Sequence, residues 1–274
     1  MANNASRPRR LPQRIACLST EAVEVLYALG EEARIAGISG FTVHPPRARK
    51  EKSKISGFSS AHSERILAVR PDLVLAFSDM QGEICRELVQ AGLEVHHFNQ
   101  RSIEGIFAMI ETIGRLVAAE EKARALVAGL EAQIEAVRSE ASSLPRRPRV
   151  YFEEWDEPMI CGIQWASELI GIAGGCDVCA DLAVAPGAGA RVIEKSALAA
   201  RRPEMVIASW CGKKFRAERF VERFAGLDLP AIASGDLYEI KSSDILSPGP
   251  AAIRHGLPQL AAIIRRWAER RTIQ

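Results

Sequence analysis

Four acidic residues flank one tryptophan in the sequence Glu153-Glu154-Trp155-Asp156-Glu157. The run directly follows an apolar segment, residues 149–152, which we expect to begin a buried strand. Carboxylates at the end of such a strand could bind a cationic or metal-bearing ligand, or could pair with Lys213 and Lys241. A solvated strand end with incidental ion pairs is the alternative.

Three of the four tryptophans, Trp155, Trp165 and Trp210, fall near expected loops in the second half of the chain. Aromatic faces suit a flat macrocycle or an aromatic ligand, whereas packing in the core is the alternative for each of them. Trp210 is the strongest candidate, because Gly212 and the pair Lys213-Lys214 indicate an exposed loop around it.

Metal and nucleophile chemistry has weaker support. Cys176-x-x-Cys179 has a zinc-like spacing, but no second Cys or His pair follows at the required distance. His96-His97 lies on an expected strand, where neighbouring side chains point to opposite faces. His44 and His62 could supply an axial ligand to haem. No Ser-His-Asp, phosphate-loop or Gly-x-Gly-x-x-Gly signature is present, so we expect a binding protein with no catalytic cofactor and no metal centre of its own.

The composition is that of a globular chain. The sequence has 274 residues, 47% of them hydrophobic, and a formal net charge of +2, which gives no reason to expect a nucleic-acid partner. No stretch reaches the roughly 20 apolar residues that span a membrane. Arginines near the N-terminus precede residues 15–29, where Glu21 and Glu24 interrupt the apolar run of an export signal. The six scattered cysteines fit free thiols slightly better than disulfides.

A pattern that occurs twice organises the chain. Residues 64–77 read as a short helix, then Pro71, then a buried strand, and residues 196–209 repeat this order around Pro203. The copies lie roughly 130 residues apart, much farther than the repeat of a solenoid. The spacing predicts two similar α/β lobes, and a cleft between lobes is a usual place for a small ligand.

Helices and strands alternate with short connections, which predicts parallel sheets. We expect a disordered tail over residues 1–13, an N-terminal α/β lobe over 14–101 and a C-terminal α/β lobe over 148–274. Residues 102–147 contain no proline before Pro145 and carry apolar residues at helical spacing. They predict a long rigid helix between the two Rossmann-like lobes, with Gly114 or residues 118–121 as places where it could break into two.

Ligand contacts in such folds come from loops at the carboxyl ends of the strands. Glu21, Met80 and Glu153 fall among these loops, together with the residues that we select as ligand-binding. The selected residues are Ser19, Thr20, Phe41, His44, Phe58, Phe77, Ser78 and Asp79 in the first lobe, and Glu154, Trp155, Trp210, Lys213, Lys241 and Ser242 in the second. We expect Phe58, Phe77, Trp155 and Trp210 to form the apolar walls.

The order of elements resembles a known family. The segments that carry the resemblance are residues 14–19, Glu64-Arg65-Ile66, Arg70-Pro71-Asp72-Leu73-Val74, Ser102-Ile103-Glu104, residues 203–208 and Ser247-Pro248. They resemble the helical-backbone (class III) substrate-binding proteins of the ABC importers for iron siderophores, haem and vitamin B12, and the cobalamin-binding branch looks closest. The resemblance covers nearly the whole chain after residue 13.

The resemblance implies a ligand held between the lobes with small closure, and a periplasmic location. It also implies a glutamate on each lobe that docks onto arginines of the membrane permease. Glu64 matches the first of these. The position equivalent to the second is Ser196, and Glu194, two residues earlier, is the candidate substitute. Lys241-Ser242-Ser243 falls where cobalamin-binding relatives often carry acidic or aromatic residues, so another corrinoid or a different ligand stays open.

Three functional hypotheses follow. The first is a monomeric substrate-binding protein that holds a corrinoid or another bulky metal chelate for an ABC importer. The second is a cytoplasmic relative that buffers or delivers a cofactor without transport, since no export signal is evident. The third is a chelatase-like enzyme, in which Glu153, Glu154 and a histidine would insert a metal into a macrocycle.

Overall fold

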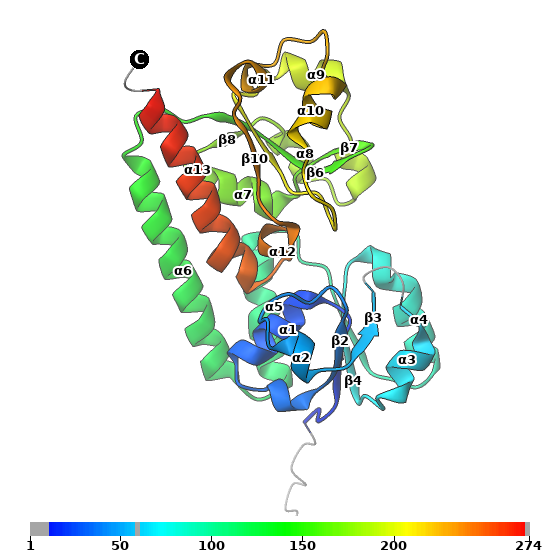
Figure 1. The fold of residues 1–274 in the computed structure, drawn as a ribbon. Coiled ribbons are helices and arrows are strands. Elements are labelled where there is room, and N and C mark those ends of the chain that lie inside the picture. The colour runs from blue at the N-terminus through cyan, green and yellow to red at the C-terminus, as the bar shows by residue number, and fades with distance from the viewer. Residues whose placement is uncertain (1–10, 58–60, 272–274) are drawn as a thin grey trace, which may run out of the picture. The chain divides into compact units, whose positions relative to one another are not determined.

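The computed structural model describes residues 11–57 and 61–271. Its internal contacts divide the chain into two compact units: Met1–Asn99 with Met109–Leu126, called the first lobe, and Gln100–Ala108 with Val127–Gln274, called the second lobe. Each lobe is built around a sheet with helices (Figure 1). The predicted α/β fold with two parallel-sheet lobes is therefore confirmed. Most of the tail expected at 1–13 lies outside the described residues.

The sheet of the first lobe is entirely parallel, in the order β3-β2-β1-β4-β5. Its central strand β1 is buried along its whole length, as expected for a strand covered on both faces. The strands are β1 (Ile15–Cys17), β2 (Ile35–Ser39), β3 (Lys54–Ser56), β4 (Leu73–Phe77) and β5 (Val95–Phe98). The helices are α1 (Thr20–Ala28), η1 (Glu32–Arg34), α2 (Ala48–Glu51), α3 (Ser63–Ala68), η2 (Asp79–Gln81) and α4 (Gly82–Gln90).

The sheet of the second lobe has the order β10-β9-β6-β7, with β8 also beside β6. All pairs are parallel except β6 with β7, which form an antiparallel hairpin. The strands are β6 (Arg149–Asp156), β7 (Met159–Cys161), β8 (Cys176–Asp177), β9 (Met205–Ala208) and β10 (Leu237–Glu239). The helices are α7 (Gln164–Ile172), α8 (Ala180–Ala183), η3 (Ala188–Arg191), α9 (Lys195–Ala200), α10 (Ala217–Arg223), α11 (Pro230–Ser234), α12 (Ser242–Ile245), the π-helical η4 (Ala252–Gly256) and α13 (Leu257–Arg270).

One expected strand of the second lobe is a helix. Residues 231–233 read as a short apolar strand, but they form the middle of α11. Pro230 occupies the first turn, where its missing N–H costs nothing, and Gly235 ends the helix in the left-handed conformation at φ +73°. Pro230 at the start and Gly235 at the end therefore favour a helix here, although the short apolar run between them had indicated a strand.

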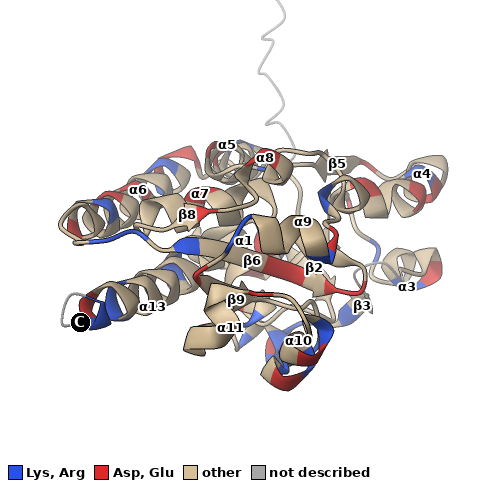
Figure 2. Cartoon of the chain, turned by 90° about the horizontal axis from the view of Figure 1, so that it is seen from above, with Lys and Arg blue, Asp and Glu red and all other residues tan. Residues whose placement is uncertain are grey.

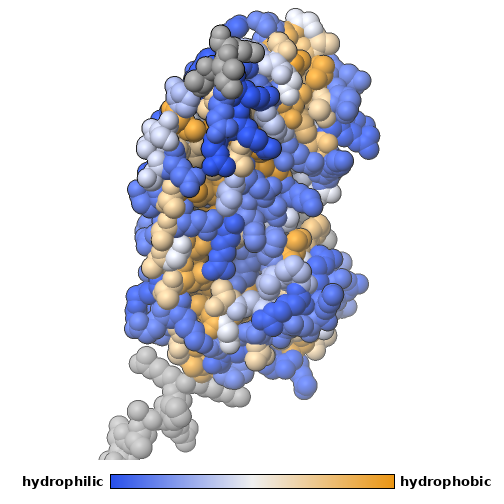
Figure 3. All heavy atoms as spheres, turned by 60° about the vertical axis from the view of Figure 1, so that its left-hand side comes forward, coloured by the Kyte–Doolittle hydropathy of each residue, from blue (hydrophilic) through white to orange (hydrophobic). Residues whose placement is uncertain are grey.

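Residues 102–147 form two helices, α5 (Ile103–Leu116) and α6 (Glu120–Ser142). The chain turns between them at Ala118, which has a φ of +56°. A Cβ at Gly114 would lie 2.5 Å from the Cβ of Ala123, so the glycine allows the start of α6 to approach the end of α5. The side of the chain along α6 is mostly hydrophilic, with smaller hydrophobic patches (Figure 3).

The repeated sequence pattern is also a repeated structure. Arg70 and Arg202, which precede the two prolines, both have a φ of +45°. In the first lobe the guanidinium of Arg14 donates to the carbonyl of Val69, the residue before Arg70, at 2.6 Å. In the second lobe Arg149 donates to the carbonyl of Arg201 at 2.6 Å. An arginine at the start of the central strand therefore holds the helix end before each Pro turn.

The acid that follows each proline completes the duplicated motif. Asp72 accepts a hydrogen bond from the backbone N–H of Arg14 at 2.8 Å, and Glu204 accepts one from the N–H of Arg149 at 3.0 Å. The backbone N–H groups of the same two acids donate to the carbonyls of Arg14 and Arg149 at 2.9 and 2.8 Å. The motif thus fixes the register at which β4 and β9 start beside β1 and β6.

Candidate functional site

The first group of predicted binding residues lies at the carboxyl edge of the first sheet. Ser19 follows β1 and precedes α1, and Ser78 follows β4 with a φ of +68°. Both serines are buried, and neither hydroxyl has a hydrogen-bond partner. Thr20 is half-buried at the start of α1, and Asp79 is exposed at the start of η2. Sequence reasoning thus placed these four residues at one edge correctly.

Apolar side chains also lie at the carboxyl edge of the first sheet. The ring of Phe41, in the loop after β2, is 57% exposed, and Met80 in η2 is 59% exposed. Phe77, expected to be a ligand wall, is the buried last residue of β4. His44 is half-buried and engages a partner. Phe58 lies outside the described residues. Among the described residues, the exposed apolar surface of this edge therefore comes from Phe41, Val43 and Met80.

Glu21 is the unusual group of this edge. It lies in the first turn of α1 and is only 3% exposed. Its Oε2 accepts a hydrogen bond from the Thr20 hydroxyl at 3.3 Å, whereas Oε1 has no partner. Burial raises the pKa of Glu21 to about 7, and the nearby polar groups of its own backbone, Ser19 and Thr20 only partly oppose that shift. The carboxyl is therefore available in both protonation states near neutral pH.

The acidic run of the second lobe is divided between buried and partly exposed positions. Figure 2 shows acidic residues in the middle of the second sheet, on β6. Glu153 is fully buried, and both of its oxygens bind the Arg223 guanidinium, at 2.7 and 2.9 Å. The Trp210 indole N–H and the Tyr151 hydroxyl donate to the same carboxylate at 2.9 and 3.2 Å. Glu153 is thus a satisfied internal charge instead of a free ligand group.

Glu154 has a buried cationic partner. Arg191, in η3, is 2% exposed and binds the two carboxylate oxygens of Glu154 at 2.5 and 3.2 Å. It also donates to the carbonyl of Cys161. The two carboxylates that the chelatase hypothesis requires, Glu153 and Glu154, are therefore both held in ion pairs by arginines.

Trp155, Asp156 and Lys213 form a partly exposed group at the end of β6. Lys213 makes an ion pair with Asp156, as one of the sequence alternatives anticipated. The Lys213 ammonium also lies 3.9 Å from the centre of the Trp155 ring, a cation–π geometry. The Trp155 indole N–H donates to the carbonyl of Glu157 at 2.8 Å. The lysine and the hydrogen bond together fix the orientation of an aromatic face that remains partly accessible.

The expectation that Trp210 lies on an exposed loop is wrong. Trp210 is 3% exposed and packs edge-on against Phe215, with ring centres 5.1 Å apart. Phe220 on α10 and Phe224 directly after that helix extend the same aromatic cluster. Trp165 is buried as well, and its indole N–H donates to the carbonyl of Ile245 at 2.9 Å. Core packing explains Trp165, whereas Trp210 is buried but also lines a pocket of the second lobe.

Lys241 and Ser242 lie where α12 begins. Lys241 is the exposed residue that precedes the helix, and Ser242 is its half-buried first residue. The acidic run makes its ion pairs with other side chains, so the pairing of Lys241 with that run is not observed among the described residues.

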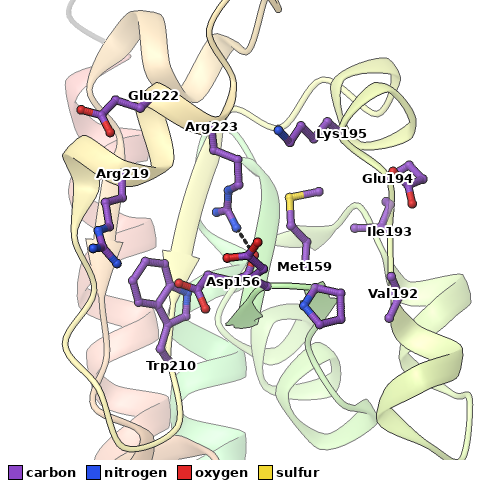
Figure 4. Close-up of a pocket in the computed structure, with 12 residues that line it drawn as sticks. Asp156, Met159, Val192, Ile193, Glu194, Lys195, Trp210, Arg219, Glu222 and Arg223 are labelled. Carbon is purple, nitrogen blue, oxygen red and sulfur yellow. Dashed lines mark hydrogen bonds between the residues drawn. The ribbon is translucent and has the colours of Figure 1, made fainter.

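A pocket of about 660 Å³ lies within the second lobe, between the β6–β7 hairpin, the start of α9 and the length of α10. Figure 4 shows Arg223 extending from α10 towards Asp156, whose backbone oxygen accepts its hydrogen bond. Met159 and Ile193 supply apolar surface, whereas Lys195 and Arg219 supply charge. Sequence reasoning missed Lys195 and Arg219, because they lie on helices and not in strand-end loops.

The two proposed docking positions are exposed. Glu64 is the second residue of α3, and Ser196 is the second residue of α9, so the structure supports the equivalence of these positions. Glu194 is the residue that precedes α9, and it also lines the pocket. Any docking role of Glu194 would therefore use a different helical position from that of Glu64.

The cysteine and histidine motifs do not form a metal site. Cys176 is exposed and Cys179 is buried, and a hydrogen bond that the Cys179 thiol donates to Cys161, together with burial, raises the pKa of Cys179. His96 packs on Phe98, with ring centres 4.2 Å apart, whereas His97 donates to the carbonyl of Ser78. Within residues 11–57 and 61–271, no three His, Cys, Asp or Glu side chains are grouped to bind a metal. None of the helices in these ranges is a candidate membrane span.

Comparison with known proteins gives consistent results. The sequence profile described as "Periplasmic binding protein" matches residues 15–243. A cobalamin-binding protein of Halobacterium salinarum is 25% identical over 257 residues, which cover 88% of this chain and 67% of that protein. A vitamin B12-binding protein of Vibrio campbellii is 27% identical over 166 residues, 60% of each chain. A periplasmic heme-binding protein from Pseudomonas aeruginosa has the same fold, with a TM-score of 0.79, 21% identity, and coverage of 93% of this chain and 94% of that chain.

Proposed function

The chain belongs to the periplasmic binding protein family, and we propose that it binds a corrinoid of the cobalamin type and presents it to an ABC importer. The family match over residues 15–243 carries this proposal, because it spans the strand-end loops of both sheets. The names of two relatives, a cobalamin-binding and a vitamin B12-binding protein, support the ligand class. In this role the protein holds its ligand, and no bond of the ligand is made or broken.

Each lobe has the kind of surface that a corrinoid needs. The ligand is a broad macrocycle with apolar faces and a polar periphery. In the first lobe, Phe41 offers an exposed ring in the loop after β2, at the sheet edge that also carries the unpartnered hydroxyls of Ser19 and Ser78. In the second lobe, Trp155 offers a ring held in place by Lys213. We propose that these rings contact the macrocycle and that the hydroxyls bind its periphery.

The test is calorimetric titration with cyanocobalamin, dicyanocobinamide, hemin and a ferric siderophore. We expect one corrinoid per chain with a Kd of about 1 µM or tighter, and a Trp155→Ala variant about tenfold weaker, because it loses an aromatic contact. Val184→Ala is the control, since Val184 is an exposed apolar residue of the second lobe away from β6. Saturable binding of hemin or the siderophore, with no corrinoid binding, would contradict the proposed ligand class.

We further propose that the protein works in the periplasm and docks to a permease through Glu64. An exposed carboxylate in the first turn of a helix is well placed to meet an arginine of a partner. Charge reversal in Glu64→Lys is expected to reduce stimulation of the cognate importer's ATPase by at least about tenfold, without changing ligand affinity. Glu83→Lys, at an exposed position in the first turn of α4, is the matched control. Equal loss in both variants would argue against a specific contact at Glu64.

A further inference from the structure

We propose that Glu21 is the specificity-determining residue for this ligand: its carboxyl exchanges hydrogen bonds with a peripheral carboxamide of the corrinoid and disfavours macrocycles that carry carboxylates there. The inference rests on the proposed function and identifies the chemical group that the site selects. Corrinoids of the cobalamin type have a periphery of carboxamide side chains, whereas haem carries carboxylates.

The first observation is an acidic side chain with an unused oxygen. Glu21 is 97% buried, and its Oε1 has no hydrogen-bond partner in the described structure. No cation among the described residues makes an ion pair with Glu21. A buried polar atom without a partner costs free energy, and in native proteins such atoms usually have a water, an ion or a ligand as partner. Oε1 of Glu21 therefore lacks a hydrogen-bond partner that a ligand can supply.

The second observation is that other buried polar atoms without partners lie at the same sheet edge as Glu21. The hydroxyl oxygens of Ser19, Thr42 and Ser78 are also buried and without partners. These residues follow β1, β2 and β4, which are adjacent in the sheet, with Cys17 opposite both Ile38 and Leu75. Parallel strands end at one edge, so the unpartnered oxygens gather at the edge where this fold class binds ligands.

The second lobe supplies an internal comparison. Glu153 is a similarly buried acid on the central strand of its sheet, but four hydrogen bonds from Arg223, Trp210 and Tyr151 satisfy its two oxygens. The fold is thus able to neutralise a buried carboxylate completely where the role is structural. Glu21 lacks such a set, and this difference indicates that its partner comes from outside the chain.

The chemistry of the group selects an amide. Burial raises the pKa of Glu21 to about 7, so the neutral acid is well populated near neutral pH. A neutral carboxyl and a carboxamide are complementary: the acid O–H donates to the amide oxygen, and the amide N–H donates to the acid carbonyl. A ligand carboxylate can accept a hydrogen bond from the neutral acid only, and the ionised form of Glu21, which is also populated near pH 7, repels it, whereas an amide can bind both forms. The Cys17 thiol lies in electrostatic reach of Glu21, and Lys52 acts on that same thiol.

The experiment compares two corrinoids with the same ring. Dicyanocobinamide carries side-chain amides, and dicyanocobyrinic acid carries carboxylates in their place. We expect the wild-type protein to bind the amide form at least about tenfold more tightly than the carboxylate form. Glu21→Ala should bind the amide form about tenfold more weakly than the wild type does. Glu21→Gln should keep its affinity for the amide form, while discrimination, the ratio of the two affinities, falls about tenfold. Glu24→Gln is the matched control, because Glu24 is buried on the same helix and already engages a partner; its discrimination should equal that of the wild type.

Discrimination that is unchanged in Glu21→Gln and Glu21→Ala, with folding verified by thermal melting, would overturn this inference alone. Equal affinity of the wild-type protein for both corrinoids would do the same. Failure of the wild-type protein to bind either corrinoid would instead overturn the proposed function, and this inference with it.

Discussion

Replacement of Arg223 by methionine is expected to lower the free energy of unfolding by about 3–5 kcal/mol. The variant would leave the carboxylate of Glu153 fully buried without its cation, while the methylene stem of the side chain is kept. Burial already raises the pKa of Glu153, and Arg223 is the main group that opposes this shift. Loss of Arg223 would raise that pKa further, so the destabilisation should increase as pH rises and the buried acid is forced to ionise.

Urea denaturation at pH 7 measures this effect, and Arg219→Met is the control. Arg219 lies on the same helix and lines the same pocket, but it makes no ion pair among the described residues. We expect the control to change stability by less than about 0.5 kcal/mol. The double variant Arg223→Met with Glu153→Gln should recover part of the loss, because it removes the unpaired charge. Equal effects at positions 219 and 223 would show that the ion pair contributes little.

Replacement of Glu21 by glutamine is expected to stabilise the unliganded protein by about 3 kcal/mol at pH 8. The pKa of Glu21 rises from 4.5 to about 7 on folding, and each of these roughly 2.5 units corresponds to about 1.36 kcal/mol. Between pH 4.5 and 7 the folded protein keeps a proton that the unfolded chain has released. The stability contributed by this proton is fully present below pH 4.5 and is lost as pH rises through 7. Glutamine has no such dependence.

Unfolding free energies of both proteins at pH 4.5, 6 and 8 check this prediction. The difference in unfolding free energy between the glutamine variant and the wild type should grow with pH and level off above pH 7. Taking this difference cancels the contributions of the titratable groups that both proteins share. Glu24→Gln should not show the same profile, since that buried acid engages a partner. A difference that stays constant across the three pH values would mean that Glu21 is better hydrated than its burial indicates.

The fold was predictable from the sequence where its signals are local. The Arg-Pro-acid turn repeats because the same strained turn and the same acid-to-backbone hydrogen bond occur in both lobes. The strands β3, β7 and β8 were missed. Lys54–Ser56 has one buried side chain among three, as expected at a sheet edge, and Met159–Cys161 becomes a strand only by pairing with β6. Such pairings depend on distant residues and leave no periodic pattern.

The candidate site was predictable in part for the same reason. The rule that ligands meet strand ends selects Ser19 and Ser78 directly. Trp210 was misjudged because a glycine and two lysines follow it, whereas its burial is determined by Phe215 and by helix α10. The ion-pair partners of the acidic run could not be predicted from the sequence. Arg191 and Arg223 lie 37 and 70 residues along the chain from the carboxylates that they bind.

Native mass spectrometry of the protein isolated from its own host tests the central claim most directly. The account predicts a 1:1 complex whose added mass is that of an intact corrinoid, and release of the same unmodified molecule on unfolding. A retained haem or siderophore, or a ligand recovered with a bond made or broken, would contradict the account.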